Sequence, residues 1–97
     1  MPSAPDALPL DAAELGRLKW RCRRGLLEND LFVERFFRRQ EAVLTRRQAE
    51  GLQKLMDLPD NDLLELLLAR REPDAALAPG LDDPAVHEVL ALMRRPG

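Results

Sequence analysis

The side chains best suited to forming a binding site lie in residues 20–30, whose sequence is WRCRRGLLEND. This segment combines the only tryptophan of the chain with arginines and two acids. Arg17, Arg21 and Arg24 are spaced by four and three residues, so on a helix they share one face, with Trp20 beside them. Arginine next to tryptophan on an exposed surface is typical of a protein-binding hot spot. The pattern therefore predicts recognition of a partner, with Arg23 and Asp30 as neighbouring contacts.

Gly25 and Glu28 add two further features to this segment. Gly25 is predicted to end a helix in a left-handed conformation and to leave no side chain that would obstruct a partner. Glu28, near the start of the next helix, can accept hydrogen bonds from backbone donors or pair with an arginine of either molecule. Spacing alone is equally compatible with an ordinary helix junction, in which Gly25 only stops the helix and the arginines are solvated.

Catalytic residues are scarce in this chain. It has one histidine, one cysteine and no tyrosine, so no nucleophile can be paired with a general base. We expect His87 on the polar face of the last helix and Cys22 buried on the face of Leu15 and Leu18. A single cysteine excludes a disulfide within the chain, and with one histidine it cannot form a zinc cluster. We expect a protein that binds, not an enzyme, with no catalytic or metal site.

Length and composition indicate one helical domain. A chain of 97 residues fits a single core, and 45% hydrophobic with only 4% aromatic residues implies a core of leucine, valine, alanine and methionine. The net charge of -2 hides a cation-rich stretch over residues 17–54. No apolar run approaches the roughly 20 residues that span a bilayer, and the start resembles neither a signal nor a transit peptide. We therefore expect a cytoplasmic protein with no membrane insertion.

Capping signals and apolar periodicity predict an all-α, five-helix bundle over residues 11–97, preceded by a flexible or extended arm over residues 1–10. Helix 1 is expected over residues 11–24 and helix 2 over residues 29–43, with Phe32, Val33, Phe36 and Phe37 in the core. Asp11 should cap helix 1, Thr45 helix 3, Asp60 or Asn61 helix 4, and Asp83 helix 5. Helix 4, which is leucine-rich nearly all round, is expected to be the most buried.

The run from Trp20 to Asp30 resembles the signature of the SdhE-type succinate dehydrogenase assembly factors, in which Arg-Gly-x-x-Glu follows a Trp-x-Cys-Arg stretch. The aromatic pair at residues 36–37 and the acidic turn at residues 60–63 match the same family pattern. Asn29 departs from it, because the family usually has an apolar residue there. The resemblance covers approximately residues 15–68.

The resemblance implies a protein that binds the flavoprotein subunit of succinate dehydrogenase, or of the related fumarate reductase, and promotes covalent FAD attachment there. The bond forms between a histidine of the flavoprotein and the flavin, so no cofactor is expected on this chain itself. By position, Arg24, Gly25 and Glu28 would form the binding surface, and the free protein would be a monomer. A small nucleic-acid-binding module, suggested by the basic stretch, and a regulatory interaction protein are the alternatives.

Overall fold

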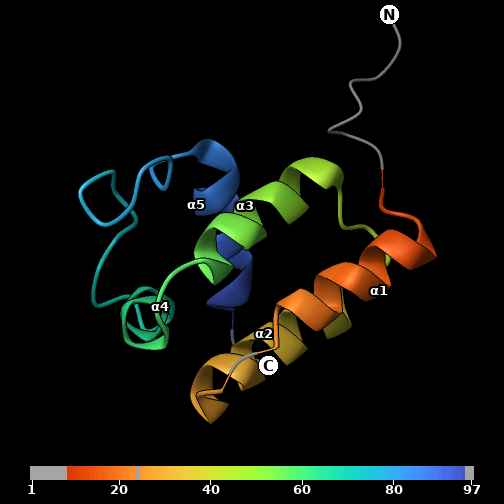
Figure 1. Cartoon of the computed structure of the whole chain (residues 1–97), viewed down its shortest axis with the longest axis horizontal. Coiled ribbons are helices and arrows are strands. Elements are labelled where there is room, and N and C mark those ends of the chain that lie inside the picture. The colour runs from red at the N-terminus through yellow and green to blue at the C-terminus, as the bar shows by residue number, and fades with distance from the viewer. Residues whose placement is uncertain (1–8, 24, 96–97) are drawn as a thin grey trace, which may run out of the picture.

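The computed structural model describes residues 9–23 and 25–95, and within them the chain forms five α-helices (Figure 1). The helices are α1 (Ala12–Arg21), α2 (Leu27–Gln40), α3 (Arg46–Met56), α4 (Asp60–Leu67) and α5 (Pro84–Met93). The prediction of an all-α fold is confirmed. None of the helices in the described part is long and apolar enough to cross a membrane.

Residues 9 and 10, at the end of the expected arm, run beside the turn that leads into α3. Pro9 forms an isolated antiparallel bridge with Thr45, and the Leu10 N–H donates to the Leu44 carbonyl oxygen at 3.2 Å. Residues 1–8 lie outside the described part of the chain, so the expectation of a flexible arm remains a prediction.

Three of the four predicted helix caps are confirmed. Asp11 and Thr45 form capping boxes with Glu14 and Gln48, and Asp83 accepts from the Ala85 N–H at 2.8 Å. The cap predicted for α4 is wrong, since the first helical residue is Asp60 and the N-cap position belongs to Pro59. Pro59 has an extended backbone with φ of -57° and ψ of 150°, so the chain becomes helical one residue later.

The junction between α1 and α2 differs from the prediction. α1 ends at Arg21, three residues early, and its C-cap Cys22 donates its backbone N–H to the Leu18 carbonyl oxygen at 3.0 Å. Lys19 and Arg21 place positive charge at the negative end of the helix dipole. Gly25 therefore does not end α1, because the chain has already left the helix at Cys22. α2 also begins and ends earlier than predicted, at Leu27 and Gln40.

The core is centred on α3 and α5, which cross closely where Gly51 meets Ala85. α2 contributes Val33, Phe36 and Phe37, as predicted. The expectation that helix 4 is the most buried is wrong. α4 lies at one end of the molecule (Figure 1), and Leu68, at its C-cap, is exposed. This short helix packs mainly against α2 and α5, so it buries Leu63, Leu66 and Leu67 on one face and leaves Leu64 partly exposed.

An ion pair between α3 and the start of α5 should make stability depend on pH. Lys54 Nζ lies 2.6 Å from Asp83 Oδ2. The hydrogen bond from Lys54, aided by the Ala85 N–H, lowers the pKa of Asp83 below its ordinary 3.8. A lowered pKa means that this carboxylate stabilises the fold above pH 3.8, and that the contribution disappears as acidification passes through the lower folded pKa.

We expect Asp83→Asn to lose stability at pH 7 and to show a shallower fall in unfolding free energy below pH 4 than the native chain. Urea unfolding followed by circular dichroism across this pH range measures both effects. Asp82→Asn, which leaves the Lys54 pair intact, is the control. Parallel pH profiles for Asp83→Asn and the native protein would contradict the prediction.

Candidate partner-binding site

Trp20 and Arg23 form an exposed pair at the end of α1. The Trp20 side chain is 71% exposed, and the Arg23 guanidinium carbon lies 5.2 Å from the centroid of its ring. This cation-π contact holds the two flat groups together in solvent. Trp20 therefore does not pack half into the core, as it could in an ordinary helix junction. An exposed tryptophan held beside an arginine is suited to burial under a partner protein.

Gly25 and Glu28 are exposed next to this pair in sequence, one before α2 and one in its first turn. A Cβ atom added to Gly25 would meet only Asp60 Oδ2, at 3.9 Å, so the space above this residue is open. The Glu28 carboxylate has no hydrogen-bond or ion-pair partner among the described residues. Its carboxylate faces solvent beside the positive end of the α2 dipole, where it can accept donors from a partner.

The structure places two of the three arginines of the predicted face together. Arg17 and Arg21 both line a groove between α1 and α3, together with the carboxylates of Glu14 and Glu50. Arg24 lies outside the described residues, so its predicted place in the binding surface stays a prediction. Arg23 lines a different groove from Arg17 and Arg21, because it contributes to the one between α1 and α2.

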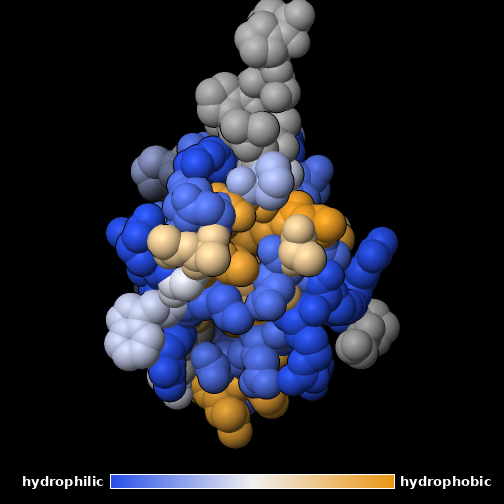
Figure 2. All heavy atoms as spheres, turned by 90° about the vertical axis from the view of Figure 1, so that its right-hand side faces the viewer, coloured by the Kyte–Doolittle hydropathy of each residue, from blue (hydrophilic) through white to orange (hydrophobic). Residues whose placement is uncertain are grey.

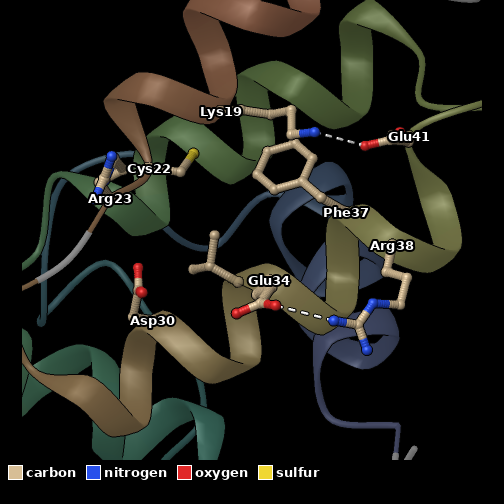
Figure 3. A pocket seen from close by; sticks show the side chains of 9 residues that line it. Lys19, Cys22, Arg23, Asp30, Glu34, Phe37, Arg38 and Glu41 are labelled. Atoms are coloured by element: carbon tan, nitrogen blue, oxygen red, sulfur yellow. Dashed lines mark hydrogen bonds and ion pairs between the residues drawn. The ribbon is translucent and has the colours of Figure 1, made fainter.

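The groove between α1 and α2, which we call the α1–α2 groove, has a volume of about 420 Å³ (Figure 3). Cys22, Val33 and Phe37 supply its apolar surface, and charged side chains surround them. The predicted neighbours Arg23 and Asp30 lie at the same end of this groove (Figure 3). Its remaining lining residues form two ion pairs, Lys19 with Glu41 at 2.8 Å and Arg38 with Glu34 at 2.9 Å. Sequence reasoning did not identify this groove, because it joins side chains of two helices.

The first turns of α2 also expose apolar side chains. Leu27 and Leu31 are one helical turn apart, and their exposures are 65% and 40%. Figure 2 shows hydrophobic side chains at the lower end of the molecule, the end at which α2 begins in Figure 1. Large apolar side chains next to charged ones are typical of a protein interface. The sequence prediction did not include these two leucines.

Asn29 and Asp60 connect the starts of α2 and α4. The Asn29 side chain is completely buried, and its Nδ2 donates to the Asp60 backbone oxygen at 2.9 Å and to Asp60 Oδ1 at 3.2 Å. Asn29 is therefore fully packed in the interior. An apolar residue was expected at this position from the resemblance to the family. The residues at 29, 33 and 36 share one helical face, and this periodicity could have indicated that Asn29 points inward.

Cys22 and His87, the remaining residues that could take part in chemistry, lie in surroundings that indicate no catalytic role. Cys22 is fully buried, as predicted, and His87 is exposed with its Nε2 3.0 Å from Asp82 Oδ1. Within residues 9–23 and 25–95, no cluster of three or more histidine, cysteine or acidic side chains could hold a metal ion.

The fold and the exposed junction define a small all-α protein whose surface features are suited to contact with another protein. Residues 16–95 match the model of the family described as flavinator of succinate dehydrogenase, so the chain belongs to this family. Three similar proteins are each named FAD assembly factor SdhE. The one from Ralstonia nicotianae is 54% identical over 87% of this chain and 84% of its own length.

The relatives from Coxiella burnetii and Legionella pneumophila are more distant. The first is 37% identical over 62% of this chain and 73% of its own length. The second is 35% identical over 70% of this chain and 86% of its own length. No solved structure shows significant similarity to the chain. The expected family is therefore confirmed by sequence similarity alone.

Proposed function

We propose that this protein is an assembly factor that binds the flavoprotein subunit of succinate dehydrogenase, or of fumarate reductase, and promotes covalent attachment of FAD to that subunit. The observation that best supports this proposal is the exposed junction at Trp20, Gly25 and Glu28, which resembles the signature of the family. The flavin bond forms within the flavoprotein, and the small protein stabilises the conformation of its client in which the bond forms.

The chemistry of the junction supports contact with a protein surface. Trp20 supplies a large rigid apolar group, and Arg23 beside it supplies donors for carboxylates and carbonyl oxygens. Glu28 supplies a carboxylate acceptor, and Gly25 leaves room for the partner backbone to approach. These groups lie in one segment of 11 residues, so a single partner surface can contact all of them.

The charge distribution favours this function over nucleic-acid binding. Many cations of the basic stretch are already paired with acids of this chain. The pairs that include them are Lys19 with Glu41, Arg38 with Glu34, Arg46 with Glu14, Arg47 with Glu88 and Lys54 with Asp83. Nucleic-acid binding relies on unpaired cations that neutralise phosphates and displace the counterions condensed on them. Gel shifts with duplex and single-stranded DNA at low salt should therefore show no complex.

The decisive experiment incubates the purified apo flavoprotein subunit with FAD, with and without this protein. Covalent flavin is read as fluorescence of the subunit band after denaturing electrophoresis, and the complex is detected by co-purification. We expect a stable complex and faster appearance of the fluorescent band. The absence of a complex together with an unchanged rate of flavin attachment would overturn the proposal.

A further inference from the structure

The start of α2 has no side-chain cap of its own, although it follows the segment proposed to contact the flavoprotein. The N-cap position belongs to Leu26, whose side chain makes no capping hydrogen bond. Helix starts normally rely on a polar side chain at this place to fix the direction of the entering chain. Another group must therefore determine how the chain enters α2 and how Glu28 points.

Asn29 and Asp60 provide this constraint from the neighbouring helix. Asn29 is in the first turn of α2 and Asp60 is the first residue of α4, and the two hydrogen bonds of Asn29 Nδ2 join them. Asn29 is completely buried, so its end of these two bonds is shielded from water, whereas Asp60 is partly exposed. The Asp60 side chain also approaches the loop before α2, because its Oδ2 lies 3.9 Å from the position that a Cβ atom would occupy on Gly25.

We infer that Asn29 and Asp60 are positioning residues for flavoprotein binding, which hold Gly25 and Glu28 in the orientation that the partner contacts. This inference rests on the proposed function. Consecutive helical residues point about 100° apart, so an inward Asn29 directs the adjacent Glu28 to the surface. A rotation of the first turn of α2 would move Glu28 and change the space above Gly25 at the same time.

The surroundings of the Asn29 Oδ1 atom indicate that asparagine is not the most stabilising residue at this position. This atom is buried and accepts no hydrogen bond from the described part of the protein. A buried acceptor without a donor destabilises a fold, and an apolar side chain of similar size at the same place does not incur this cost. Asn29→Leu should therefore keep the fold while removing both hydrogen bonds to Asp60.

The experiment measures the Kd for the flavoprotein subunit and the unfolding midpoint of each variant of the full chain. Asn29→Leu and Asp60→Leu should each weaken binding by about tenfold, which is the size expected for loss of a charge-assisted hydrogen bond. Asp60→Asn keeps an oxygen that can accept from Asn29 Nδ2, so its Kd should stay near the native value. Asp62→Leu removes an acid from the same turn of α4 and should also bind normally.

Several outcomes would overturn the inference. If the native protein binds and Asn29→Leu binds equally well, the orientation of α2 does not depend on this link. If Asp62→Leu weakens binding as much as Asp60→Leu, the general charge at the start of α4 explains the effect. If both leucine variants weaken binding only in proportion to a lowered unfolding midpoint, the link is merely structural. Failure of the native protein to bind would instead contradict the proposed function.

Discussion

Gly51→Ala should lower the free energy of unfolding, because overpacking a well-packed core costs about 2 kcal/mol, the middle of the usual range. A Cβ atom at Gly51 would lie 2.8 Å from both the carbonyl carbon and the oxygen of Ala85. These are backbone atoms of α5, so they cannot rotate away as the end of a flexible side chain would. The added methyl group must therefore push apart α3 and α5, the pair at the centre of the core.

The opposing effect at Gly51 is smaller. Replacing glycine by alanine inside a helix contributes about 1 kcal/mol through helix propensity alone. Gly16 in α1 offers a matched control, because a Cβ atom there would have nothing within 4 Å. Gly16→Ala should raise the unfolding midpoint, whereas Gly51→Ala, with a net loss of about 1 kcal/mol, should lower it by about 5 °C for a domain of this size. Thermal unfolding followed by circular dichroism distinguishes them, and a raised midpoint for both would contradict the prediction.

Gly25→Arg should have the opposite profile, with a folded protein and a weakened complex. Among the described residues, a Cβ atom at this position would meet only Asp60 Oδ2, at an ordinary contact distance of 3.9 Å, so the helices need not move to admit it. We expect the unfolding free energy to change by less than about 0.5 kcal/mol, as is usual at the surface. A partner that approaches Gly25 closely would instead meet a long charged side chain, and the Kd should rise about 100-fold, as at a hot spot.

The Kd of Gly25→Arg can be measured by titration calorimetry with the flavoprotein subunit, together with its covalent flavin. Ala42→Arg is a suitable control, because Ala42 is exposed beyond the opposite end of α2, about 20 Å away by helix length. Glu28→Ala removes the exposed carboxylate and should weaken the complex without loss of helical signal. Normal binding by Gly25→Arg would exclude this junction from the interface. Unfolding of the variant would instead assign Gly25 a structural role.

Gly25 and Gly51 therefore illustrate why the same residue type has different consequences in this fold. One glycine leaves an exposed surface open, and the other permits two helices to touch at their backbones. The sequence indicates a special role for Gly25, because this glycine follows arginines at a predicted helix junction. Gly51 is one position within a regular helix, and its sequence neighbours give no sign that Ala85 lies against it.

The sequence alone determined the elements that depend on neighbouring residues. Capping boxes at Asp11 and Thr45, and the spacing of Val33, Phe36 and Phe37, depend on residues three or four positions apart. These local interactions make the starts of α1 and α3, the buried face of α2 and the all-α class predictable. The signature around Gly25 and Glu28 is also local, so the family can be indicated without the tertiary structure.

The tertiary structure decided the features that join distant parts of the chain. The link between Asn29 and Asp60 spans 31 residues, and the contact of Gly51 with Ala85 joins different helices. The early end of α1 at Cys22 and the peripheral place of α4 also depend on packing. Local propensity specifies where helices form, but their relative positions follow from which side chains can be buried together, and periodicity within one helix does not contain that information.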